Sequence, residues 1–101
     1  MAHIVPRSYV TPDEVAWVQD QIAALPANAH VALHLHDGRR LVGVMMDRAQ
    51  LQDVIDQDGR EGINALLRFN MRGADPFEGG TGVTLWLHEV RAVEHLGPVA
   101  P

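Results

Sequence analysis

Two histidines, His34 and His36, stand two positions apart in a run of alternating apolar and polar residues. Residues at i and i+2 of a β-strand point to the same face, so the two imidazoles would lie side by side. Imidazole nitrogens are common ligands of metal ions, which makes this pair a candidate metal site with Asp37 and His88 as further ligands. No complete ligand set with a known spacing is visible, so a solvated or interfacial strand face is the favoured interpretation and no cofactor is expected.

Acidic residues gather around Asp58-Gly59, a dipeptide typical of tight turns. They are Asp53, Asp56, Asp58 and Glu61. Paired carboxylates can exchange protons with a substrate or bind a hard cation. Their oxygens do not fall at the offsets of an EF-hand loop, and acids beside such a turn usually remain in water. We therefore interpret this group as a solvated turn.

Residues able to form a covalent intermediate are scarce. Ser8 is the only serine, Tyr9 is the only tyrosine, and cysteine and lysine are absent. A covalent mechanism needs a nucleophile that is activated by a neighbouring base, and no base is patterned beside Ser8. The sequence therefore predicts a protein without enzymatic activity.

The charge balance bears on binding to nucleic acids. Eight basic residues, all of them arginine, stand against thirteen acidic ones, which gives a net charge of -5. Proteins that bind nucleic acid through its phosphates usually carry a basic face, so DNA is not an expected partner. RNA binding stays open as an alternative. It would use a local basic patch of Arg39, Arg40 and Arg48 together with the second hairpin residues Asp58 and Arg60.

Trp86 is a candidate anchor for an interaction surface. It alternates with Val83, Leu85 and Leu87 and therefore points away from the face that they form. A large aromatic side chain on that side either covers the protein itself or contacts another molecule. The candidate surface consists of Trp86, His34, His36 and His88. Since short sheets leave open edges, we expect self-association through a strand edge, most simply as a dimer.

Length and composition set the overall class. With 101 residues, 47% of them apolar, the chain has the size of a single globular domain over residues 1–101. No stretch approaches the roughly 20 apolar residues of a membrane span, and no basic-then-apolar leader opens the chain. Without cysteine there is no disulfide framework. These features predict a cytoplasmic protein that does not bind membranes.

One helix is predicted near the start of the chain. Thr11 is a good N-cap, Pro12 fits the first helical position, and Glu14 completes a capping box. An apolar stripe follows at spacings of three and four, formed by Val15, Val18, Ile22 and Leu25. The pattern predicts a helix over residues 12–25 whose apolar stripe packs against another element.

From His30 the apolar period changes to two, and Asp37-Gly38 interrupts the alternation. Asp-Gly between alternating runs favours a hairpin with a two-residue type I′ turn, in which His36 pairs with Arg39. That register predicts one buried face made of Val31, Leu33, Leu35, Val42 and Val44, with a bend of the second strand at Gly43.

The second Asp-Gly predicts another hairpin. Its downstream strand places Ile63, Ala65, Leu67, Phe69 and Met71 on one face. The apolar residues upstream match that face only across an odd-length loop, so we predict three loop residues with Gly59 in the left-handed conformation. Residues 49–55 are either a strand or a short helix. A loop at 73–82, strands at 83–88 and 92–96 with a tight turn between them, and a frayed tail at 97–101 complete the pattern.

The hairpin with Asp37-Gly38-Arg39, Gly43 and its alternating apolar residues resembles the first motif of the Sm-like proteins. The strings at residues 37–39, 58–65 and 85–88 are similar to those of a small bacterial family of unknown function with an Sm-like fold. The resemblance implies a mainly β fold with one N-terminal α-helix and a five-stranded, strongly bent antiparallel Sm-like barrel over about residues 30–96.

The same resemblance bears on function. RNA-binding Sm-like proteins grip a base with an aspartate, an apolar or aromatic residue and an asparagine in the second hairpin loop. Here that loop has the sequence Asp56-Gln57-Asp58-Gly59-Arg60-Glu61, and Arg72-Gly73 precedes the fourth strand instead of following it. Our first hypothesis is therefore a noncatalytic, self-associating interaction module. RNA binding is the alternative, and a metal-binding hydrolase or sensor centred on His34 and His36 is the third.

Overall fold

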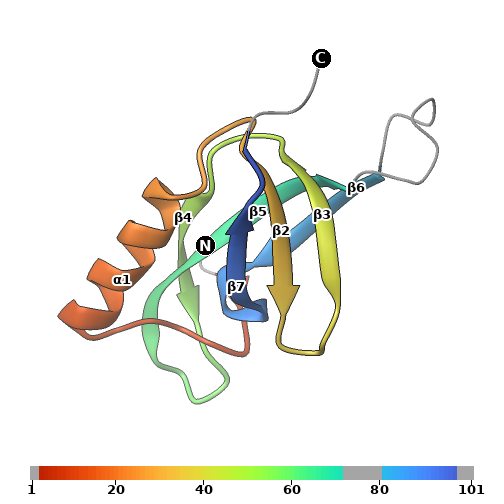
Figure 1. Cartoon of the computed structure of the whole chain (residues 1–101). Helices are drawn as coiled ribbons and strands as arrows, with labels where there is room; N and C mark the ends of the chain where they lie inside the picture. The colour runs from red at the N-terminus through yellow and green to blue at the C-terminus, as the bar shows by residue number, and fades with distance from the viewer. Residues whose placement is uncertain (1–2, 72–80, 98–101) are drawn as a thin grey trace.

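The computed structural model describes residues 3–71 and 81–97, which form one helix followed by a strongly curled antiparallel sheet (Figure 1). The elements in chain order are β1 His3–Ile4, α1 Pro12–Ala23, β2 His30–Leu35, β3 Arg40–Met45, β4 Gln50–Ile55, β5 Glu61–Met71, β6 Thr81–Trp86, the short 3₁₀ helix η1 Leu87–Glu89, and β7 Val90–His95.

The sheet is a curled half-barrel of the predicted type. Its strand order is β1-β4-β5-β3-β2-β7, and β6 pairs with β5. Both β3 and β4 pair antiparallel with β5, so they are two parts of one long strand. Counting them together, the barrel has five antiparallel strands, to which the two-residue β1 is added in parallel on β4. The first and last barrel strands, β2 and β7, are hydrogen-bonded neighbours, as the barrel prediction required.

The helix begins as predicted. The Thr11 hydroxyl accepts the Glu14 backbone N–H at 3.2 Å, and the Glu14 carboxylate accepts the Thr11 N–H at 3.1 Å. These bonds satisfy N–H groups that have no partner inside the helix. The helix ends at Ala23, two residues before the predicted end. Leu25 nevertheless reaches the core, where it is fully buried.

The first hairpin differs from the prediction by one residue. The Leu35 N–H donates to the Arg39 carbonyl at 2.8 Å, so the loop contains His36, Asp37 and Gly38. Only Gly38, at φ 95°, has a positive φ in this loop, whereas a type I′ turn needs two such residues. The predicted pairing of His36 with Arg39 is therefore wrong.

This change of register alters which β3 side chains face the core. Leu33 pairs with Leu41 and Val31 with Gly43, because a one-residue shift turns every side chain to the other face. Met45 is therefore fully buried on the core face. Val42 and Val44, predicted to lie in the core with Val31, Leu33 and Leu35, are half-buried on the opposite face.

Gly43 allows β3 to approach β5 closely. A Cβ at this position would lie 2.1 Å from the Asn70 carbonyl oxygen, so no other residue fits without moving the backbone. Further along, Met45 pairs with Phe69 and Gln50 with Leu66. The long strand therefore advances five residues where β5 advances three, and the extra residues make it bend at residues 46–49. This bend is in addition to its close approach to β5 at Gly43.

The second hairpin agrees with the prediction. The Asp56 N–H donates to the Arg60 carbonyl at 3.0 Å across a three-residue loop, and Gly59 has a φ of 81°. Residues 50–55 form a strand, which excludes the short helix. On β5 the predicted apolar face holds, with Ala65, Leu67 and Phe69 fully buried.

The last elements lie close to their predicted positions. A 3₁₀ turn at Leu87–Glu89 takes the place of the predicted tight turn, and β7 begins at Val90, two residues earlier than predicted. Most of the loop predicted at 73–82 and residues 98–101 of the predicted tail lie outside the described residues. No helix in the described ranges is long and apolar enough to cross a membrane.

Candidate interaction surfaces

The N-terminal segment, residues 3–9, wraps around the second hairpin. The Val5 N–H donates to the Ile55 carbonyl at 2.9 Å on the outer edge of β4. Four residues later, Tyr9 and Ile63 exchange two hydrogen bonds of 2.8 and 3.0 Å on the other edge of β5. The segment therefore passes from one edge of the hairpin to the other. We call residues 3–9 the N-terminal arm.

Asn64 fixes the arm from beneath. Its side chain is fully buried, and its Nδ2 donates to the Arg7 carbonyl and to His88 Nδ1, both at 2.9 Å. An imidazole nitrogen that accepts a hydrogen bond carries no proton, so the other nitrogen of a neutral His88 carries it. Burial lowers the pKa of His88, which favours that neutral form. Sequence reasoning missed Asn64, whose only signal is a polar residue in an apolar strand.

Asp56 ties the hairpin loop to the arm. Its carboxylate accepts the backbone N–H groups of Arg60 at 2.9 Å and Asp58 at 3.0 Å, and the Ser8 hydroxyl at 3.0 Å. These donors, the Arg60 N–H above all, lower the pKa of Asp56. One of the four acids predicted to surround a solvated turn, Asp56, thus holds the hairpin loop and the arm together. Ser8, its partner in the arm, is buried.

His34 lies in an ion-paired cluster that spans three strands. Its Nε2 is 3.1 Å from Glu94 Oε1 on β7, and the Arg40 guanidinium of β3 donates to the same oxygen at 3.3 Å. The hydrogen bonds from His34 and Arg40 lower the pKa of Glu94. This half-exposed cluster lies beside β7, on the face opposite the core.

His36 has other neighbours than His34. It lies in the first hairpin loop, where its N–H donates to the Glu89 carbonyl at 3.1 Å. Its side chain borders a pocket of about 230 Å³ together with His88, Asp37 and Arg39. The two histidines of the candidate metal site therefore have different surroundings: His34 contacts Glu94, and His36 borders this pocket. Within residues 3–71 and 81–97, no group of three His, Asp or Glu side chains is placed to hold a metal ion.

Trp86 ends β6 directly before the short helix η1. It pairs with Leu66 of β5, and its backbone N–H donates to Glu89 Oε2 at 2.7 Å. Its side chain is half-buried. Of the four residues predicted to form one interaction surface, Trp86, His36 and His88 thus lie around η1, whereas His34 lies on the β2–β7 pair.

The predicted RNA-binding residues lie in three parts of the molecule. Arg39 and Arg40 are at the first hairpin, where Arg39 pairs with Asp37 at 2.7 Å. Asp58 and Arg60 are at the tip of the second hairpin. The remaining one, Arg48, lies at the junction of β3 and β4, next to the helix residues Gln19 and Ile22.

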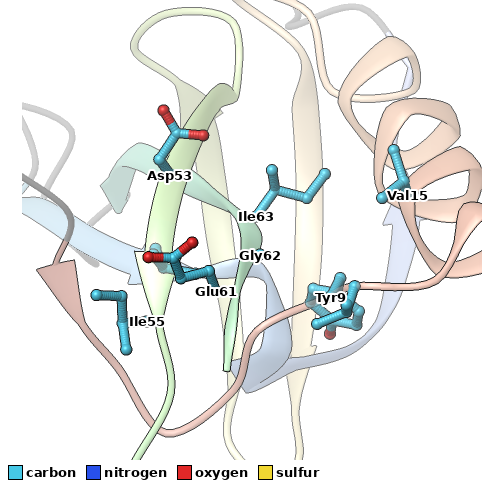
Figure 2. Close-up of a pocket in the computed structure, with 9 residues that line it drawn as sticks. Tyr9, Val15, Asp53, Ile55, Glu61, Gly62 and Ile63 are labelled. Carbon is cyan, nitrogen blue, oxygen red and sulfur yellow. The ribbon is translucent and has the colours of Figure 1, made fainter. Parts of the chain in front are cut away.

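A groove runs between α1 and β4 and has two hollows. The first holds about 560 Å³ and is bordered by Val15 of the helix, by Asp53 and Ile55 of β4, and by Glu61 and Ile63 of β5 (Figure 2). A second hollow of about 460 Å³ lies further along the same two elements; its lining residues are Gln19, Ile22, Arg48, Ala49 and Leu51.

Comparison with solved structures defines the class of fold. The chain is similar to XC5848 from Xanthomonas campestris, whose crystal structure is described as adopting a novel variant of the Sm-like motif. The two superpose with a TM-score of 0.78 and 24% sequence identity, over 99% of this chain and 100% of the other. The fold is therefore Sm-like, as the hairpin motif predicted.

Within that class the family is also defined. The family model of the domain of unknown function DUF3247 matches residues 2–96, and the chain belongs to this family. The predicted resemblance to a family of unknown function with an Sm-like fold is thus confirmed. No curated protein matched the chain.

Proposed function

We propose that this protein is a noncatalytic interaction module that forms a homodimer through the outer edge of β7. The observation that carries the proposal is an open strand edge: β7 is paired with β2 on one side and with no strand of the described chain on the other. Unpaired edges are templates for pairing with another chain. We place this module in the cytoplasm.

The hydrogen-bond pattern identifies the groups available at that edge. The Leu96 N–H donates to the His30 carbonyl, so the residues of β7 that face β2 are those at even positions. Val93 and His95 therefore direct their N–H and C=O groups outward. An antiparallel pair of β7 strands centred on Val93 would place Arg91 opposite His95 of the second copy and Glu94 opposite Ala92, with His34 one strand away on β2.

The edge of β6 is the less suitable of the two. The backbone N–H and C=O groups of Ile63 bond to Tyr9, on the side of β5 away from β4. The backbone groups of odd-numbered β5 residues therefore face β6, and those of Thr84 on β6 point outward. However, Gly82 weakens this strand, and the Glu89 carboxylate already occupies the N–H of Trp86. Trp86 and the pocket around η1 then form the border of the interface rather than its centre.

Two matched substitutions test the proposal. His95→Pro removes one outward N–H from β7 without removing a bond to β2, and Thr84→Pro does the same on β6. We expect sedimentation velocity to show a dimer for the natural chain and for Thr84→Pro, and a monomer for His95→Pro. A monomer at every concentration of the natural chain would refute the proposal.

The RNA-binding alternative gains no support from the position of the arginines. Arg39 and Arg40 both have carboxylate partners, and Arg48 lies apart from both hairpin loops. A phosphate-binding surface needs several free cations on one face. RNA binding would return as the better proposal if the protein bound unstructured RNA with a steep dependence on salt.

A further inference from the structure

We propose that His88 is a pH-sensitive switch that controls the N-terminal arm. In its neutral form the imidazole holds the arm against the second hairpin through Asn64, and in its protonated form it no longer does so. The arm then opens while the rest of the barrel stays folded. This switch does not involve the outer edge of β7, so it can fail while the proposed dimer stands.

The orientation of the Asn64 side chain is fixed by two backbone groups that each have a single role. The Arg7 carbonyl can only accept a hydrogen bond, and it lies 2.9 Å from Nδ2. The Ala65 N–H can only donate, and its nitrogen lies 2.8 Å from Oδ1. The atom that faces His88, also at 2.9 Å, is therefore Nδ2, and the imidazole Nδ1 must accept its second N–H.

Protonation of His88 is incompatible with this arrangement. A charged imidazole carries a hydrogen on both ring nitrogens, so the Nδ1–H would point at an N–H of Asn64. The Asn64 amide cannot turn over to accept it, because its oxygen would then face the Arg7 carbonyl and its nitrogen the Ala65 N–H. Asn64 is fully buried, and a buried polar group that loses its partner is costly.

The charged groups around His88 come from three parts of the described chain. Glu89 of η1 favours the charged imidazole, whereas Arg7 of the arm and His36 of the first hairpin loop oppose it. Burial is the largest influence, and the pKa of His88 is lowered as a result. A proton on His88 would therefore also repel the arm through the Arg7 guanidinium. Two further charged residues border the pocket and pair with each other at 2.7 Å; they are Asp37 and Arg39.

The other contacts of the arm do not respond to the same range of pH. Val5 and Tyr9 are bound through backbone groups, which do not titrate; Figure 2 shows the arm passing from Ile55 to Tyr9. Ser8 donates to Asp56, and hydrogen bonds from backbone N–H groups lower the pKa of that carboxyl from its usual value of 3.8. Of these contacts, the one through Asn64 alone depends on a histidine, the side chain that ordinarily titrates between pH 5 and 8.

The lowered pKa of His88 fixes the direction in which pH moves the arm. With the arm open, we expect this pKa to approach its ordinary value of about 6.5. The neutral imidazole therefore stabilises the closed arm fully above pH 6.5, and this contribution is lost progressively as the pH falls below that value. Because a single proton is involved, the equilibrium constant for opening should rise by no more than about tenfold for each pH unit.

The test follows the full chain by NMR between pH 7.5 and 4.5. Imidazole chemical shifts report the charge of His88. Protection factors against hydrogen exchange at the Tyr9 and Ile63 N–H groups report closure of the arm, because these two amides bond it to β5. We expect both protection factors to fall about tenfold in step with the titration of His88, while those of Val31 and Leu33 in the central strand β2 do not change.

Two matched substitutions separate His88 from the other histidines. His88→Gln keeps a hydrogen-bond acceptor but carries no charge at any pH, so protection at Tyr9 should stay constant between pH 7.5 and 4.5. His34→Gln removes a histidine from the β2–β7 pair, away from the arm, and should respond to pH as the natural chain does.

Three results would overturn the switch. They are a His88 that stays neutral down to pH 4.5, protection at Tyr9 and Ile63 that does not change while His88 titrates, and an equal loss of protection in His88→Gln. The second result would mean that the charged imidazole turns into the solvent and leaves the arm in place. The first two are measured on the natural chain, so they decide the question even if the variant does not fold.

Discussion

The two hairpins contain the same Asp-Gly turn but are supported in different ways. Each has three loop residues and a glycine at positive φ, Gly38 at 95° and Gly59 at 81°. The first hairpin leaves His34 and Arg40 at the surface, bonded to Glu94. The second is enclosed by the N-terminal arm, with Asn64 fully buried beneath it.

In both hairpins the turn sets the register of the strands but not their environment. In both loops a carboxylate accepts backbone N–H groups, Asp37 from Arg39 and Asp56 from Asp58 and Arg60. Only the second carboxylate also receives a bond from a distant segment, through Ser8. The second hairpin can therefore lose the N-terminal arm that covers it without losing its turn.

The largest effect is expected from adding a methyl group to one strand of the first hairpin. In Gly43→Ala the Cβ meets the Asn70 carbonyl of β5 at 2.1 Å, so the centre of the sheet must separate. In Gly62→Ala the obstacle at 2.5 Å is the Tyr9 carbonyl of the arm, which can move away. Urea unfolding should show losses of about 3 kcal/mol and about 1 kcal/mol respectively. Equal losses would mean that the arm is as rigid as the sheet.

Asn64→Ala should have the next largest effect. It leaves the Arg7 carbonyl and His88 Nδ1 without their donor in a buried place. Loss of such buried bonds costs about 2 kcal/mol. The same urea measurement checks this value, and hydrogen exchange should show the arm opening while β2 and β3 stay protected. Exchange that rose equally in both hairpins would contradict the expectation that the arm opens without loosening the first hairpin.

The two turn glycines should behave alike. A Cβ at Gly38 or Gly59 meets nothing within 4 Å, so Gly38→Ala and Gly59→Ala introduce only the strain of a positive φ. That strain costs about 1–2 kcal/mol for a residue other than glycine. Thermal unfolding of both variants should show matched losses. A clearly larger loss at Gly59 would indicate that the arm depends on the turn geometry.

The smallest effect concerns pH. Hydrogen bonds from backbone N–H groups lower the pKa of both Asp37 and Asp56 below the usual value of 3.8. A carboxyl with a lowered folded-state pKa stabilises the protein above its unfolded pKa, and this contribution disappears as the pH falls through the folded value. Stability should therefore decline below about pH 4. Asp56→Asn should make stability fall less with pH and should also loosen the arm. Asp37→Asn should make stability fall less with pH and leave the arm in place. Urea unfolding between pH 5 and 3 measures the change in stability.

Local patterns in the sequence were sufficient for much of the fold. The capping box at Thr11 and Glu14 lies within four residues, and it predicted the start of the helix correctly. The mismatch of apolar faces across Asp58-Gly59 predicted the three-residue loop. The same argument failed at the first hairpin, because Ala32 and Val42 make the opposite face of those strands apolar as well, so hydrophobic alternation alone could not fix the register.

The arm and the groove could not be predicted in this way. Residues 3–9 show no periodicity, and they are held by backbone groups and by Asn64, Ser8 and Asp56, which are distant in sequence. The groove depends on where α1 crosses the sheet, and only the tertiary structure determines that. The sequence predicted Asp53 and Glu61 as acids of a solvated turn, whereas the fold places them at the border of the first hollow together with Ile55 and Ile63.

The proposal of a dimer through β7 is tested most directly by amide hydrogen exchange at several protein concentrations. We expect the outward N–H groups of Val93 and His95 to become more protected as the concentration rises, while the N–H of Thr84 on β6 continues to exchange rapidly. Exchange at Val93 and His95 that stays fast and independent of concentration would contradict it.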